Sequence, residues 1–167
     1  IHYLDWIRSV LGNPKSVHCK SIKHPSVPKL SDARSSIILE YDKDVRCCLS
    51  INHTHDTDNH GMKHTHAYAR VEGLKGAAYI KFGLLLNYPK GEPEEIEIST
   101  DGVEWTKVDN VGTWFPDAFI GTMSSLQRFA LGEDNELLHS VDNAYETMAV
   151  VYACLESNKI PGTKVSY

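Results

Sequence analysis

The sequence predicts an α+β fold, a largely antiparallel open β-sheet with helices packed on one face. Two observations lead to this prediction. Apolar residues recur at helical spacing only near the two ends of the chain, whereas the middle alternates short strand-like runs with turn signals. Strands joined by short turns pair antiparallel, so the middle should form a meander of hairpins. We expect the 167 residues to form one domain.

The first predicted element is a short amphipathic helix over Tyr3–Leu11. Its apolar stripe consists of Leu4, Ile7 and Leu11, and Gly12 and Pro14 follow as stop signals. The sequence opens inside this pattern and has no initiator Met. We therefore expect the chain to be a piece of a longer protein.

The middle of the chain is predicted to hold strands joined by tight turns. The clearest hairpin joins Ser35–Tyr41 to Val45–Ile51 across Asp42–Asp44. The other predicted strands are Ser16–Lys23, Thr65–Val71, Ala77–Phe82, Glu94–Ser99 and Val103–Val108. Gly102 suits the turn before the last of these, because glycine readily adopts a positive φ.

The face of the sheet that points away from the helices is predicted to be mixed in character. Alternation along the strands places residues such as Tyr41, Leu49 and Tyr68 on it. An exposed face with large apolar residues is typical of an interface. We therefore expect self-association through this open face, most simply as a two-fold dimer.

The last third of the sequence is predicted to contain two helices and a short final strand. The first helix carries the apolar stripe Phe119, Met123, Leu126 and Ala130. The second carries Ala144, Met148, Val151, Tyr152 and Leu155. Ser140 is a suitable N-cap for the second helix, and Pro161 and Gly162 end it before a strand over Thr163–Ser166.

Composition limits the classes of partner. Hydrophobic residues make up 41% and charged residues 23% of the chain, which is typical of a soluble globular protein. No apolar run approaches the roughly 20 residues that cross a bilayer, so we expect no membrane contact. A net charge of −5 with scattered Lys and Arg gives no reason to expect nucleic acid. The four cysteines show no disulfide or metal spacing, and we expect a cytoplasmic protein.

The two ends of the chain also resemble a known domain. The opening run Ile1–Gly12, the Trp114-Phe-Pro-Asp117 run, and Ser140–Ser157 followed by Gly162–Val165 occur in the order found there. They resemble the C-terminal domain of the glucose-fructose oxidoreductase, inositol dehydrogenase and MocA (Gfo/Idh/MocA) family. The resemblance implies a glyceraldehyde-3-phosphate dehydrogenase-like C-terminal fold, preceded in the longer chain by a Rossmann nucleotide-binding domain.

The same resemblance implies an NAD(P)-dependent dehydrogenase of a sugar or polyol that assembles as a homodimer or homotetramer. NAD or NADP would bind in the full-length enzyme. This chain lacks the glycine-rich dinucleotide fingerprint, so we expect it to bind no cofactor alone and to be inactive alone. His2 falls where the family carries its active-site histidine, and the resemblance implies that it takes the hydroxyl proton near a lysine of the missing domain.

A cluster of five histidines is the most unusual local feature of the sequence. Its members are His53, His55, His60, His64 and His66. A polyol needs several neutral donors and acceptors, and Asn52, His53, His64 and His66 could supply them at a sheet edge. Two alternatives stay open. The cluster could ligate a metal in a non-enzymatic, β-rich binding module, or it could be a solvated loop with no function.

Overall fold

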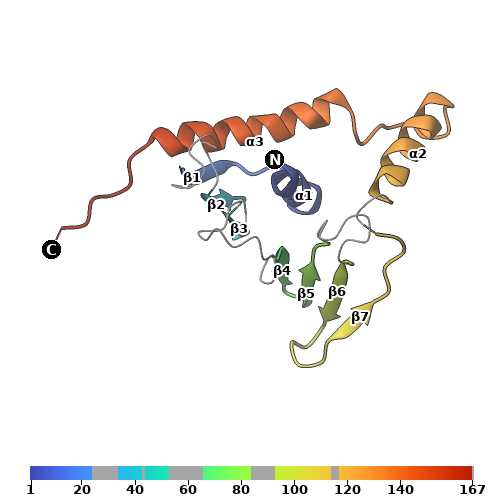
Figure 1. Ribbon diagram of the computed structural model, residues 1–167, viewed down its shortest axis with the longest axis horizontal. Coiled ribbons are helices and arrows are strands. Elements are labelled where there is room, and N and C mark those ends of the chain that lie inside the picture. Colours follow the sequence, from blue (N-terminus) through green and yellow to red (C-terminus); the bar gives the residue numbers. More distant parts are fainter. Residues whose placement is uncertain (24–33, 43, 53–65, 84–92, 114–116, 167) are drawn as a thin grey trace, which may run out of the picture. The chain divides into compact units, whose positions relative to one another are not determined.

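The computed structural model describes residues 1–23, 34–42, 44–52, 66–83, 93–113 and 117–166 (Figure 1). It confirms the α+β class and the antiparallel pairing. The described strands form two sheets and not one, with orders β1-β2-β3 and β4-β5-β6-β7. The chain divides into two compact units, Ile1–Asn59 with His139–Tyr167, and His60–Leu138. None of the described helices is long and apolar enough to cross a membrane.

Each unit holds one of the two sheets. The first unit contains α1 (His2–Leu11), β1 (Ser16–Ile22), β2 (Arg34–Glu40), β3 (Arg46–Asn52) and α3 (Val141–Lys159). The second contains β4 (Tyr68–Gly73), β5 (Gly76–Lys81), β6 (Glu95–Ser99), β7 (Thr106–Val108) and α2 (Ala118–Ala130). The predicted strand over Thr163–Ser166 is wrong, because these exposed residues pair with none of the described strands.

β7 begins three residues later than the sequence predicts, and a local turn explains the difference. The Asp101 carboxylate accepts hydrogen bonds from the amides of Val103 and Glu104, both at 2.9 Å. A carboxylate that binds backbone amides in this way competes with a strand ladder. At the same end of the sheet, beside this turn, a Cβ on Gly76 would lie 2.3 Å from the Ser99 carbonyl oxygen, so only glycine fits there.

One face of the first sheet is covered by helices, as predicted. Its core consists of Leu4 and Ile7 from α1, Cys19, Ile37 and Leu39 from the strands, and Val150 and Cys154 from α3. Leu39 lies at the centre and is 0% exposed. Figure 1 shows α3 running beside β1 with α1 next to it. These side chains pack together and form the apolar core of this unit.

The buried stripe of α3 differs from the predicted one. Thr147, Val150 and Cys154 are buried, whereas three residues of the predicted stripe, Ala144, Tyr152 and Leu155, are exposed. Thr147 is polar and does not belong to the predicted apolar stripe. Its hydroxyl is hydrogen-bonded to Asp5 and Arg8, which allows a polar residue to be buried at this position.

The prediction that Tyr41 and Leu49 lie on the open face is wrong. Both pack against the buried core. Leu49 pairs with Ile37 across the sheet, and directly opposed residues share a face. The open face carries instead the exposed residues Ser16, His18, Lys20, Ile22, Ser36, Ile38, Glu40, Arg46, Cys48, Ser50 and Asn52. This face is mainly polar.

The edge of the first sheet at β1 is capped by side chains of α3. The Cys19 amide donates to Ser157 Oγ and the Ser21 amide donates to Asn158 Oδ1, both at 2.9 Å. Lys20 Nζ donates to the Asn158 carbonyl oxygen at 3.1 Å. These bonds join the strand edge to the end of the helix and satisfy amides that face away from β2.

A buried arginine joins α1 to α3. The Arg8 guanidinium donates to Asn13 Oδ1 at 2.7 Å, to Asn143 Oδ1 at 3.1 Å and to Glu146 Oε2 at 2.5 Å. It also donates to the Thr147 hydroxyl, which itself donates to Asp5. The Arg8 side chain is only 6% exposed. A buried charge is tolerated only when its donors are paired in this way.

Replacing Arg8 by Met should lower the free energy of unfolding by about 2–4 kcal/mol, because Glu146, Asp5 and Thr147 lose their common donor. The measurement is urea denaturation followed by circular dichroism. Arg128→Met is the control, since Arg128 makes an exposed ion pair with Asp134 and should matter less. Equal losses in the two variants would contradict a special role for Arg8.

Candidate functional site

His2 is the first residue of α1 and its side chain is exposed. The first turn of this helix is held in place from both sides. The Asp5 amide donates to the Ile1 carbonyl oxygen at 3.0 Å, and the Asp5 carboxylate accepts from Thr147 of α3. The backbone of His2 is therefore fixed to the core of the first unit, while its imidazole faces solvent.

The other predicted site residues are divided between the two units. Asn52 is the exposed last residue of β3, and His66 is exposed just before β4. The imidazole of His66 stacks on Tyr68, with ring centroids 5.3 Å apart and an interplanar angle of 22°. His53 and His64 lie outside the described residues, as do His55 and His60.

Tyr68 belongs to an exposed row of rings on the second sheet. Tyr68 and Tyr79 stack with centroids 6.0 Å apart, and Tyr68 is 58% exposed. Arg70 pairs with Tyr79 in the ladder and lies 5.6 Å from the centroid of Trp105. We call Tyr68, Arg70, Tyr79 and Trp105 the aromatic face. Tyrosine, tryptophan and arginine in this combination are typical of binding surfaces.

Charges next to the aromatic face compensate one another. Glu95 accepts from Lys81 at 3.3 Å and from Lys107 at 3.4 Å. The hydrogen bond from Lys81, and then the charge of Lys107, hold the pKa of Glu95 below its ordinary value. Arg70 donates to Glu72 at 2.5 Å. Glu95 is therefore ionised at neutral pH and serves as an acceptor, not as an acid.

A serine, a glutamate and a histidine lie together on the open face of the first sheet, but their hydrogen bonds do not suit nucleophilic catalysis. Ser16 Oγ donates to Glu40, and His18 Nε2 lies 3.4 Å from the same carboxylate. The bond from Ser16 lowers the pKa of Glu40 most strongly. An activated serine needs a base that takes its proton, and here its partner is a carboxylate stabilised in the ionised form. This cluster is a surface hydrogen-bond network.

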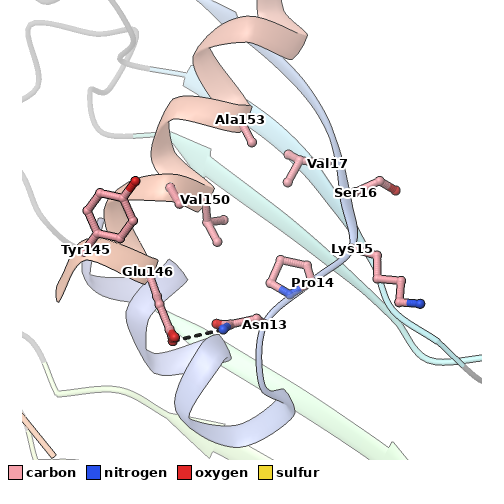
Figure 2. Close-up of a pocket in the computed structure, with 10 residues that line it drawn as sticks. Asn13, Pro14, Lys15, Ser16, Val17, Tyr145, Glu146, Val150 and Ala153 are labelled. Carbon is pink, nitrogen blue, oxygen red and sulfur yellow. Dashed lines mark hydrogen bonds between the residues drawn. The ribbon is translucent and has the colours of Figure 1, made fainter. Parts of the chain in front are cut away.

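An open groove of about 240 Å³ lies between α3 and the start of β1 (Figure 2). Apolar side chains such as Val17, Val150 and Ala153 line it. The charged groups at its rim are already paired, since Glu146 binds Arg8 and Asn13, and Lys15 binds Asp42. The groove is smaller than typical ligand sites of about 300–1,000 Å³ and includes no predicted site residue. We do not assign it to the substrate.

Two features of the structure, the buried Arg8 and the stacked pair Tyr68 and Tyr79, carry signals in the sequence that could have predicted them. Arg8 lies four residues after Leu4, on the apolar side of α1, and a charge at that position signals a buried partner. Tyr79 lies beside Tyr68 because of the hairpin register, in which Tyr68 pairs with Lys81. The predicted hairpin and period-2 alternation could have placed these two rings on one face.

Two buried thiols face each other in the core of the first unit. Cys19 and Cys154 are both free and buried. Burial, together with the neighbouring Cys19 thiol, raises the pKa of Cys154 to about 12. Burial also raises the pKa of Cys47, while Cys48 on the open face is exposed. Cys47 and Cys48 thus point to opposite faces, as successive residues of a strand do.

Iodoacetamide at pH 8 should label Cys48 and leave Cys154 unmodified. Only about one Cys154 thiol in 10⁴ is ionised four pH units below its pKa, and the thiolate is the reactive form. Peptide mass mapping after timed quenching measures both sites. Labelling of Cys154 at the rate of Cys48 in the folded protein would contradict this arrangement.

No protein-family model matches the chain, and no curated protein matches it in sequence. Solved structures do match its fold. A protein of Thermotoga maritima assigned as an oxidoreductase superposes with a TM-score of 0.69 at 16% identity, over 95% of this chain and 42% of its own. An Agrobacterium radiobacter oxidoreductase, in complex with NAD⁺, L-tartaric acid and magnesium, gives 0.68 at 16%, over 95% and 45%.

The aldose-aldose oxidoreductase of Caulobacter crescentus, complexed with glycerol, gives a TM-score of 0.67 at 14% identity, over 95% of this chain and 43% of its own. The chain thus spans less than half the length of these three proteins. At these identities the likeness concerns the fold alone. The chain has the fold of one domain of these oxidoreductases.

Proposed function

We propose that the chain is the C-terminal substrate-binding and oligomerisation domain of an NAD(P)-dependent oxidoreductase of the Gfo/Idh/MocA type. The observation that carries the proposal is the fold likeness, which covers 95% of this chain but less than half of each oxidoreductase. The rest of such an enzyme must bind the nicotinamide, because this sequence lacks the glycine fingerprint for a dinucleotide. This domain would contribute substrate contacts and assembly.

The proposed substrate is a sugar or polyol. Two of the similar structures hold small polyhydroxylated molecules, L-tartaric acid in one and glycerol in the other. On this chain, Asn52 and the histidines His53, His64 and His66 would supply neutral donors and acceptors for the substrate hydroxyl groups. Asn52 and His66 are exposed, as this role requires.

His2 is the proposed acid–base residue of this domain. Oxidation of a secondary alcohol sends a hydride to the nicotinamide and requires a group that takes the hydroxyl proton. An imidazole suits this exchange near neutral pH. The exposed side chain of His2, on a helix turn fixed by Asp5 and Thr147, supports the assignment. In this proposal His2 works beside a lysine of the nucleotide-binding domain.

Assembly is proposed through an open sheet face, as a homodimer or homotetramer. The aromatic face of the second sheet supports this role better than the open face of the first sheet, which is mainly polar. Tyrosine, tryptophan and arginine are enriched at the centres of protein interfaces. The adjacent charges compensate one another within the chain, so a second copy would meet little net charge.

Replacing His2 by Ala in the longer enzyme should reduce turnover about 10²- to 10⁴-fold, the usual range for a positioned acid–base group. Steady-state assays with NAD⁺ or NADP⁺ and a panel of sugars and polyols give kcat and KM. His18→Ala is the matched control, since His18 is an exposed histidine beside Glu40 on the open face of the first sheet. Near wild-type kcat and KM for His2→Ala would remove His2 from the mechanism.

The rival hypothesis of a metal-binding module makes a different prediction. Among the described residues, no group of three or more His, Cys, Asp or Glu side chains could hold a metal ion. A metal bound to the folded state would add stability by mass action, so its removal would lower the melting temperature. The proposed polyol role involves no metal and therefore predicts that a chelator leaves the melting temperature unchanged. A drop on chelation that zinc reverses, and that His53→Ala or His64→Ala abolishes, would favour the rival.

A further inference from the structure

Two free thiols lie in contact inside the first unit, and the proposed function uses neither of them. Cys19 of β1 is 5% exposed and Cys154 of α3 is 7% exposed. Both belong to the apolar core, and the Cys154 thiol is hydrogen-bonded to the Cys19 side chain. Two cysteines can be joined by a disulfide only when their side chains point at each other. The contact between these two thiols satisfies that condition.

The register of α3 on β1 explains why the two thiols lie together. At one end of the contact, Val17 and Val150 line the same groove (Figure 2). At the other end, the Ser21 amide donates to Asn158 Oδ1 at 2.9 Å. The four residues of strand rise by about 13 Å and the eight residues of helix by about 12 Å. The two elements therefore advance together, and their midpoints, Cys19 and Cys154, lie opposite each other.

Further contacts hold the strand and the helix together at this point. The Cys19 amide donates to Ser157 Oγ at 2.9 Å, and Ser157 follows Cys154 by about one helical turn. On the strand, the Cys19 sulfur lies 3.6 Å from Ser21 Oγ. The backbones of both cysteines are thus fixed by the native structure. A bond between the sulfur atoms would replace a contact that already exists.

We propose that Cys19 and Cys154 form a site of reversible oxidation, at which a disulfide joins β1 to α3. The oxidant is a small-molecule disulfide, with oxidised glutathione as the probe. One cysteine thiolate attacks it, forms a mixed disulfide and releases one glutathione, and the other cysteine thiolate then displaces the second glutathione. The two cysteines lose two electrons and two protons, which leave with the two glutathione thiols. This site uses no residue of the proposed function and goes beyond it.

Burial makes the thiols unreactive while the core is closed. Burial, together with the neighbouring Cys19 thiol, raises the pKa of Cys154 to about 12, and the thiolate is the reactive form. Separation of the end of α3 from β1 would expose both thiols to water and return Cys154 to an ordinary thiol pKa. The hydrogen bonds of Ser157 and Asn158 to β1 oppose this separation. Oxidation should therefore proceed through opening of the end of α3.

The disulfide would hold the two ends of the chain together. Cys19 lies near the start of the sequence and Cys154 near its end, so the bond closes a long loop. A cross-link of this kind restricts the unfolded chain and stabilises the folded state. We expect the oxidised protein to melt about 4–16 °C above the reduced protein. Oxidation would thus stabilise the contact between α3 and β1.

The test is timed oxidation of the reduced 167-residue protein by oxidised glutathione, in a Cys48→Ser background that removes the exposed thiol. Samples are quenched with acid, alkylated and mapped by peptide mass spectrometry. We expect a cross-linked peptide that contains Cys19 and Cys154 and that dithiothreitol cleaves. Cys47 is the internal control, since burial also raises its pKa but it lies on β3. It should stay outside the disulfide.

Ser157→Ala tests the opening step. Loss of one hydrogen bond to the Cys19 amide should populate the opened state, and so increase the rate of disulfide formation, about fivefold. Ser50→Ala is the matched control, since Ser50 is an exposed serine on the open face of the same sheet, and its rate should equal that of the parent. Circular dichroism checks that each variant is folded.

Four results would each overturn the inference. The thiol pair of the folded protein could stay reduced or take up glutathione without forming the Cys19–Cys154 bond. The bond could form only after urea has unfolded the protein. The oxidised protein could melt below the reduced one, or Ser157→Ala could react no faster than Ser50→Ala. None of these results bears on the assignment of His2, which the activity assay tests.

Discussion

The first unit depends on a buried guanidinium. Arg8 draws its partners from α1, from the turn after it and from α3, and its contact with Asn143 spans 135 residues of sequence. Because burial removes the charge from water, the arginine is tolerable only when all these acceptors are in place. The network therefore forms only when the two ends of the chain meet. The same contact between α1 and α3 covers the apolar core, holds the first turn of α1 and thereby positions His2.

Local chemistry in the sequence predicts most of the elements but not how they combine. Turn signals and alternation correctly predict the β2–β3 and β4–β5 hairpins, because a short turn fixes the pairing of its two strands. The division into two sheets could not be read in this way, since it depends on pairing between distant segments. Nor could alternation decide which face is buried. Ile37 and Ile38 are equally apolar, and only the docking of α1 and α3 selects the face that carries Ile37.

The candidate site was predictable only in part, for a related reason. His2 and the histidine cluster are visible in the sequence as residue types that bind or move protons. The neighbours that give such residues a setting come from tertiary packing. Thr147 fixes the helix turn of His2 through Asp5, and Tyr79 extends the row of rings that begins with His66 and Tyr68. Polar groups are satisfied by hydrogen-bond partners far away in sequence, and a local sequence pattern cannot predict these partners.

The capping of β1 by Ser157 and Asn158 has a consequence for how the first sheet can grow. An open strand edge is a template to which any extended segment can add. Here the end of α3 closes the border of the described sheet at β1, because Ser157 and Asn158 bind the amides that an added strand would need. The helix thus protects this border with side chains from the other end of the chain. Loss of the final turn of α3 would free these amides and expose β1 to non-native β pairing.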